Sequence, residues 1–287
     1  MARRQGSADS SSDGRPGNSG GWLVRFGNFT TALPLASLAV AVLALAAWQF
    51  LPPFFGVPKY IIPQLSDLWT EGLRMWQDDN LLLHFFSTAS MAILGFILGS
   101  LLGAVFGYAL GLMPAWEKVL SPYILALQIA PKVAFAPLFI LWFGYNFMPK
   151  LVTTVLVVFF PILVNVLQAM RVLDRDLINL ARAYNMSKAK IFWKIMMPYS
   201  MPNLMAGLRI GATLAVIGVT VGELVGGEIG LGYLISFGQG QADTPMVFDA
   251  IILLTVIGIV MYWGVTVIEA RVLHYLPRAI ESPEAAA

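Results

Sequence analysis

Long apolar stretches separated by short polar ones dominate the sequence. Blocks with few charged residues lie at about residues 33–51, 85–112, 119–142, 150–170, 203–224 and 247–268. An α-helix needs about 20 apolar residues to cross a bilayer, and each block comes close to that length or exceeds it. The pattern therefore predicts an all-α, polytopic membrane protein with six transmembrane helices.

The segments outside these blocks are too short to hold a second globular core. Residues 1–25 are rich in Ser, Gly, Asp and Arg and lack hydrophobic periodicity, which predicts a disordered tail. We expect one membrane domain over residues 26–275 and a short tail over residues 276–287.

A segment ahead of the second block has an amphipathic pattern. Its apolar residues recur at helical spacing, while its charged residues take the other positions: Leu65, Leu68, Trp69, Leu73 and Trp76 against Asp67, Glu71 and Arg74. Residues 64–77 are therefore predicted to form a helix that lies in the membrane interface.

The distribution of Lys and Arg predicts the orientation of the chain. With the N-terminus inside, most basic residues of the connecting segments fall on the cytoplasmic side, as the positive-inside rule requires. Only Lys59, Arg74 and Lys150 fall outside. Both termini are thus expected in the cytoplasm, and residues 171–201 become the largest cytoplasmic loop.

Composition narrows the chemistry. The 287 residues are 58% hydrophobic and only 12% charged, with a mean hydropathy of +0.74 and a net charge of +2. The absence of cysteine excludes disulfides, thiolate zinc sites and cysteine nucleophiles. The two histidines, His84 and His274, lie far apart in the sequence. We expect no catalytic residue, no metal site and no nucleic-acid partner.

Five glycines recur at every fourth position of the second block. They are Gly95, Gly99, Gly103, Gly107 and Gly111. A helical face without side chains lets another helix approach closely, so a helix-packing seam is the favoured interpretation. A groove for a substrate is the alternative.

The third and fifth blocks each contain an ionisable residue in apolar surroundings. Lys132 follows Pro131, and Glu223 lies near the outer end of its block. A lysine at the centre of a transmembrane helix costs about 2.5–3.5 kcal/mol, so Lys132 should face a cavity, a carboxylate or the interface. Both residues are candidates for lining a translocation pathway, and structural pairing is equally consistent with the pattern.

The large cytoplasmic loop is predicted to form a helical hairpin. Apolar residues in the segment 176–184 recur at helical spacing, at Leu177, Leu180, Ala181 and Tyr184. Asn185 suits the left-handed position that ends a helix, and Ser187 is a suitable N-cap for a second helix. Pro198 is expected to end that second helix and turn the chain toward the fifth span.

The loop resembles the EAA loop of permeases of ATP-binding cassette importers, which docks on the ATPase subunit. The resemblance is carried by Asn179, Ala181, Arg182, Asn185, Ser187, Phe192, Ile195 and Pro198. The sequence departs from the family at Asn179, which replaces the usual Glu, and at Asn185, which replaces the usual Gly. By this resemblance Phe192 seats the hairpin, while Arg182, Ser187 and Lys190 are candidates for polar contacts with the ATPase.

The rest of the chain after the first tail resembles the nitrate, sulfonate and taurine branch of these permeases. The matching positions are His84, Ser87, Gly95-Phe96, Pro131-Lys132, Pro137-Leu138, Leu141-Trp142-Phe143-Gly144, Glu223, Gly226, Gly230-Leu231-Gly232, Gly258, Glu269 and Arg271. The resemblance implies a fold like that of type I importer permeases, in the cell inner membrane.

The resemblance also implies partners. It suggests two cytoplasmic ATPases that use ATP and Mg²⁺, a second copy of the permease in a homodimer, and an external substrate-binding protein. The chain itself lacks a GxxxxGK[ST] phosphate loop and should bind no cofactor. The solute remains open between a small anion and a flat heterocycle such as a vitamin or pyrimidine precursor. A stand-alone secondary transporter or channel that uses Lys132 and Glu223, and a structural membrane anchor, are the rival interpretations.

Overall fold

A computed structural model describes residues 29–275, which are helical apart from short connections. The expected tails, residues 1–25 and 276–287, lie outside the described residues. The chain divides into one unit that ends at Gly56 and another that begins at Val57, so the domain expected over residues 26–275 includes parts of both. The first unit contains α1 (Phe29–Phe54), in which Ser37–Phe54 is long and apolar enough to cross a membrane.

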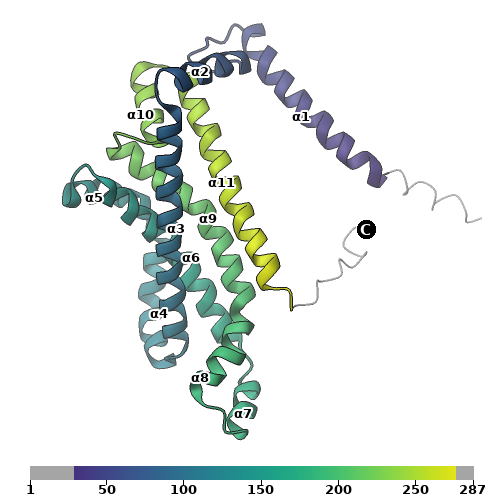
Figure 1. The fold of residues 1–287 in the computed structure, drawn as a ribbon, viewed down its shortest axis with the longest axis vertical. Helices are drawn as coiled ribbons and strands as arrows, with labels where there is room; N and C mark the ends of the chain where they lie inside the picture. Colours follow the sequence, from purple (N-terminus) through teal and green to yellow (C-terminus); the bar gives the residue numbers. More distant parts are fainter. Residues whose placement is uncertain (1–28, 276–287) are drawn as a thin grey trace, which may run out of the picture. The chain divides into compact units, whose positions relative to one another are not determined.

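The second unit contains the remaining helices (Figure 1). In chain order they are α2 (Leu65–Gln77), α3 (Leu81–Gly111), α4 (Pro114–Ile129), the 3-10 turn η1 (Lys132–Phe135), α5 (Ala136–Phe143), α6 (Phe147–Val172), α7 (Arg175–Ala183), α8 (Lys188–Ile191), the π turn η2 (Phe192–Met196), α9 (Met197–Gly226), α10 (Leu231–Gln241) and α11 (Thr244–Val272).

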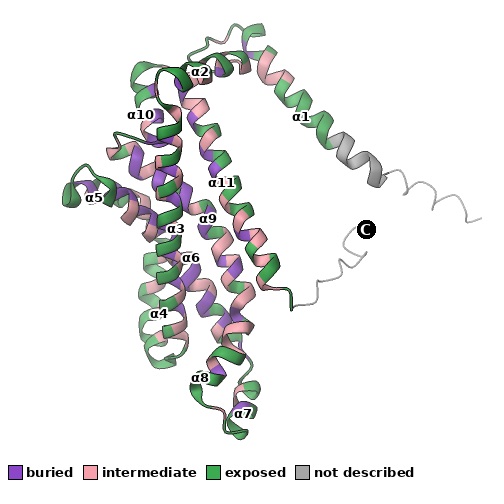
Figure 2. Cartoon of the chain, viewed as in Figure 1, coloured by how far each residue is buried: buried purple, intermediate pink, exposed green. Residues whose placement is uncertain are grey.

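The centre of this unit is the packing of α3 and α9 on α6. Val158, Ile162 and Val166 of α6 are buried together with Ala215 of α9. Figure 2 shows buried positions concentrated along α6 and α9. Helix α6 is therefore the most enclosed of the five described helices that are long and apolar enough to cross a membrane.

The glycine face of α3 lies against α6. A Cβ atom added to Gly99 would lie 2.8 Å from Val158 Cβ, and one added to Gly103 would lie 2.6 Å from the carbonyl oxygen of Phe159. Gly95, Gly107 and Gly111 meet Thr154, Val166 and Met170 in the same way. Only residues without a side chain permit this distance between the two helices.

A second apolar cluster joins α2, α10 and α11. Met75, Leu231, Leu234 and Met246 are buried in it. Polar contacts add to the apolar packing, since Arg74 forms ion pairs with Asp79 at 3.3 Å and with Asp243 at 3.6 Å. The predicted amphipathic helix at residues 64–77 is confirmed as α2, with Leu68 and Met75 buried and Trp69 and Trp76 exposed.

Five described helices are long and apolar enough to cross a membrane. The predicted third span, residues 119–142, is not one helix: α4 and the segment Lys132–Phe143 meet at an angle of 78°. The break falls at Ala130 and Pro131, where proline has no N–H to continue the helical ladder. The expected total of six spans is reached only if this bent pair counts as one.

The connection between the fifth and sixth spans contains a helix that the sequence analysis did not predict. Helix α10 begins after Gly230, whose φ of 134° is a conformation that glycine adopts readily, and ends at Gln241, before Ala242 with its left-handed φ of 56°. Three glycines within the helix weakened its sequence signal. Tertiary contacts rather than local propensity therefore hold α10 in place.

Candidate coupling hairpin and pathway residues

The segment between α6 and α9 forms the predicted helix-turn-helix. Asp174 caps α7 by accepting a hydrogen bond from Asp176 N at 2.8 Å, and Ser187 caps α8 by accepting one from Lys190 N at 3.4 Å. Asn185 has a φ of 54°, the left-handed conformation predicted for it. Met186 N donates to Ala181 O at 3.0 Å, which closes the turn.

The hairpin has one buried and one exposed side. Ala181 and Ile191 are buried, whereas Leu177, Leu180 and Tyr184 of the predicted apolar stripe are exposed. The polar candidates Asn179, Arg182, Asn185, Ser187 and Lys190 are exposed as well. The exposed side of the hairpin thus combines apolar side chains with basic ones.

The second short helix does not end at Pro198, contrary to the sequence prediction. The helical run continues from Lys188 to Gly226, and Pro198 lies in the first turn of α9. In the π turn that precedes it, Met197 N donates to Phe192 O five residues earlier. Proline fits into a helix at a position where no backbone N–H is needed for a hydrogen bond. The change in hydrogen-bond spacing at a π turn creates such a position.

One ring contact and two hydrogen bonds that involve tyrosine hydroxyls fix this junction to the bundle. The ring of Phe192 meets Tyr108 of α3 edge to face, with centroids 5.4 Å apart. The Tyr108 hydroxyl lies 2.8 Å from Ser200 Oγ. Tyr275, which follows α11, donates a hydrogen bond from its hydroxyl to Pro198 O at 2.7 Å. Sequence reasoning missed both tyrosines, since single aromatic residues in apolar spans give no distinct signal.

Lys132 lies at the break of the bent span. Pro131 precedes η1, and Lys132 Nζ donates to the carbonyl oxygen of Gln128 at 2.6 Å. The ammonium also lies 4.8 Å from the centroid of the Phe160 ring. Because the helix breaks here, the Gln128 carbonyl is free to accept a hydrogen bond from a side chain. The kink therefore supplies a partner for the Lys132 ammonium.

Glu223 lies in a different part of the bundle and is only 1% exposed. One of its oxygens lies 2.9 Å from Thr88 Oγ1 of α3 and accepts a hydrogen bond from Gly232 N at 2.9 Å. Thr88 Oγ1 also accepts from Leu231 N at 2.8 Å. The carboxylate thus ties the N-terminus of α10 to α3 and α9. Among the described residues no contact joins Glu223 to Lys132.

Two further polar residues support the same connection. His84 Nδ1 lies 3.1 Å from Gly230 N, and Lys150 Nζ donates to Ile229 O at 2.8 Å. His84 and Thr88 are one helical turn apart, a spacing that could have revealed a polar stripe on α3. The loop between α9 and α10 is therefore held by side chains from α3 and α6.

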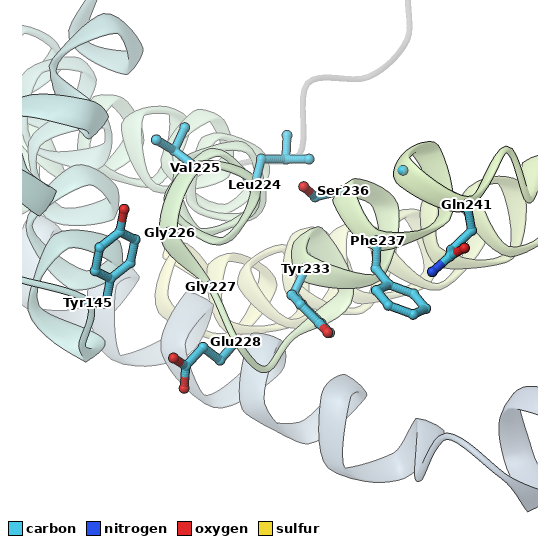
Figure 3. A pocket seen from close by; sticks show the side chains of 11 residues that line it. Tyr145, Leu224, Val225, Gly226, Gly227, Glu228, Tyr233, Ser236, Phe237 and Gln241 are labelled. Atoms are coloured by element: carbon cyan, nitrogen blue, oxygen red, sulfur yellow. The ribbon is translucent and has the colours of Figure 1, made fainter.

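An open pocket of about 600 Å³ lies beside this loop (Figure 3). Tyr145, from the connection between α5 and α6, lines one side of it. Tyr233, Phe237 and Gln241 of α10 line another, and Glu228 belongs to the loop.

Comparisons with known proteins agree with these features. Residues 95–274 match the family described as "Binding-protein-dependent transport system inner membrane component". The chain is 36% identical over 233 residues to the riboflavin transport system permease of Chloroflexus aurantiacus, covering 80% of this chain and 86% of that protein. It is 26% identical over 232 residues to the taurine transport system permease of Escherichia coli, covering 81% and 82%.

The fold is similar to a chain of the inward-facing MetNI methionine ABC transporter, with a TM-score of 0.58 at 17% identity. That match covers 68% of this chain and 98% of the other. This likeness concerns the fold alone. The family match identifies the chain as a multi-pass inner-membrane protein whose ATPase activity lies in a partner subunit. The chain therefore belongs to the binding-protein-dependent transport system inner membrane components, the permease subunits of ATP-binding cassette importers for small solutes.

Proposed function

We propose that the hairpin of α7 and α8 is the surface on which the partner ATPase docks, and that its movement passes directly into α9. The unbroken helical run from Lys188 to Gly226 carries this proposal. Its 39 residues correspond to a rod of about 58 Å. A displacement of α8 therefore reaches the far end of the span without passing through a flexible linker.

The exposed side of the hairpin supports the docking role. Tyr184 is 78% exposed and Trp193 is 63% exposed, next to basic residues such as Arg182. Aromatic side chains and arginine are enriched where proteins bind one another. Asn179, an amide where the family has a carboxylate, would contact the ATPase through hydrogen bonds rather than charge.

The contacts of the hairpin with the bundle suggest how a movement of the hairpin would be transmitted to other helices. The ring of Phe192 packs against Tyr108 of α3, and the carbonyl oxygen of Pro198 accepts a hydrogen bond from Tyr275, which follows α11. ATP and Mg²⁺ would be used by the ATPase, and its two states would bias the bundle between inward-open and outward-open arrangements.

Co-purification tests the docking surface. Tyr184→Glu places a charge in the exposed apolar stripe and should abolish recovery of the ATPase with the tagged, detergent-solubilised permease. Tyr60→Glu is the matched control, because Tyr60 is 64% exposed and lies in the connection before α2. Recovery of the ATPase by Tyr184→Glu and Tyr60→Glu in equal yield would exclude the hairpin as its docking surface.

We also propose that both termini lie in the cytoplasm and that two copies of the chain form the permease. The basic hairpin residues support the orientation through the positive-inside rule. Co-purification of two differently tagged copies tests the homodimer. Accessibility of single cysteines introduced into each tail tests the orientation, because the natural sequence has none.

The relatives favour one solute class over the other. Identity is 36% with the riboflavin permease and 26% with the taurine permease. We therefore propose a flat heterocycle as the solute, delivered by an external binding protein. The separate surroundings of Lys132 and Glu223 give no support to ion coupling in a stand-alone transporter.

A further inference from the structure

The pocket beside α10 has the properties of a solute site. Its volume, about 600 Å³, lies within the range of about 300–1,000 Å³ for small-molecule sites. In the proposed orientation α9 runs from the coupling hairpin to the outer side, so its C-terminal end at Gly226 brings the pocket to the outer mouth of the permease. A solute released by an external binding protein would reach this position first.

Aromatic rings line the pocket and are partly fixed in place. Tyr233 is stacked on His84 with ring centroids 5.8 Å apart and planes 11° apart. Phe237, one turn further along α10, lies 5.8 Å from Tyr233. Tyr145 stands apart from them in the connection before α6, as Figure 3 shows. Because neighbouring side chains already restrict these rings, a ligand that stacks on them loses little side-chain entropy on binding.

The charge of the lining disfavours anions. Glu228 carries the only formal charge among the described residues that line the pocket, while Ser236 and Gln241 supply neutral donors and acceptors. Lys150 of α6, which is only 8% exposed, already donates its ammonium to Ile229 O of the loop. A sulfonate in the pocket would thus face a carboxylate without a free cation.

We propose that this pocket is a solute subsite for a flat, uncharged heterocycle, which stacks on the tyrosine rings and donates a hydrogen bond to Glu228. The proposal rests on the proposed function, because it takes the chain to be a permease with this end outside. It adds a selectivity element within the permease itself, beyond the choice made by the binding protein.

Gly240 provides a direct test. Gly240 lines the pocket, and a Cβ atom added to it has no neighbour within 4 Å. Gly240→Trp should therefore fill the pocket, and Gly240→Ala is its matched control. Tyr145→Ala removes a ring from a residue that is 74% exposed, and Tyr123→Ala, at 65% exposure and outside the pocket, is its control.

Binding is measured by calorimetry on the permease–ATPase complex in nanodiscs. The probes are riboflavin, 4-amino-5-hydroxymethyl-2-methylpyrimidine and ethanesulfonate. At least one ring compound should bind more tightly than ethanesulfonate. Tyr145→Ala should weaken that binding about tenfold, as expected for the loss of one stacked ring, and Gly240→Trp should abolish it. Glu228→Gln should strengthen ethanesulfonate binding about fivefold.

Two results would overturn the subsite: no binding of either ring compound up to about 1 mM, or unchanged binding in both Gly240→Trp and Tyr145→Ala. ATPase recovery and basal ATP hydrolysis, measured on the same samples, separate this proposal from docking. If the binding results contradict the subsite while the ATPase still co-purifies, the subsite alone is rejected. If the ATPase is lost only in Tyr184→Glu, that result supports the hairpin as the docking surface, independently of the subsite.

Discussion

Glu223 of α9 and Thr88 of α3 are joined by a hydrogen bond of 2.9 Å, and neither residue is more than 1% exposed. The same threonine hydroxyl accepts a hydrogen bond from Leu231 N, the first residue of α10. One buried pair therefore connects three helices. It also holds the loop that forms one wall of the pocket described above.

Replacement of Glu223 by alanine should destabilise the protein. The change leaves Gly232 N and the Thr88 hydroxyl without their partner, at a cost of about 1–3 kcal/mol for each buried group left unpaired. Glu223→Gln should cost clearly less, because the amide oxygen can accept from Gly232 N and the amide nitrogen can donate to Thr88. Thermal unfolding in nanodiscs compares the variants. Equal unfolding temperatures for the two would show that the hydrogen bonds contribute little.

Replacement of Gly103 by alanine should weaken the packing of α3 on α6. The added Cβ would lie 2.6 Å from the backbone oxygen of Phe159, so the helices must separate and lose contacts along the seam. We expect a loss of about 1–3 kcal/mol, typical of overpacking. Gly264→Ala on α11 is the control, since its Cβ meets nothing within 4 Å. A denaturation series in mild detergent measures the free energy of unfolding of both variants. Similar losses of stability in the two would contradict the assignment of the glycine face of α3 as a packing seam.

Substitutions at Asn185 should distinguish the effect of the turn conformation on ATPase binding from the effect of the exposed side chains of the hairpin. Asn185→Gly should retain ATPase recovery, because glycine adopts a φ of 54° readily. Asn185→Val should reduce it, since the left-handed conformation costs an ordinary residue about 1–2 kcal/mol and a β-branched one is particularly unsuited to it. If the valine variant binds the ATPase as well as the glycine variant does, the turn geometry is not required for docking.

The start of α2 should loosen in acid. The hydrogen bond from Lys59 Nζ, 2.6 Å from Asp67 Oδ1, holds the pKa of the Asp67 carboxyl below its ordinary value. Its contribution to stability is therefore complete above the unfolded pKa of about 3.9 and is lost as the pH falls through the lower folded value.

Hydrogen exchange of the α2 amides measures this effect in the wild type and in Asp67→Asn. The wild type should be better protected at pH 7, and the difference should vanish at the acid end of the titration. A difference that is independent of pH would assign the protection to packing instead.

The sequence by itself determined the class of the protein and several local features. Hydrophobic blocks of bilayer length predict membrane helices whatever their packing, because the bilayer sets the required length. The caps and turn of the hairpin at Asp174–Ser187 also follow from local chemistry, since Asn185 and Ser187 act within a few residues of themselves.

The tertiary structure decided what distant residues do together. Pro198 continues a helix because a π turn precedes it, and the proline signal alone predicted a break. Glu223 meets Thr88, which lies 135 positions away, and no local pattern encodes that distance. Likewise, burial against α2 and α11 stabilises α10, although its glycines give it a low helix propensity. Local propensity acts over one or two turns, whereas the energy of burial depends on which elements meet.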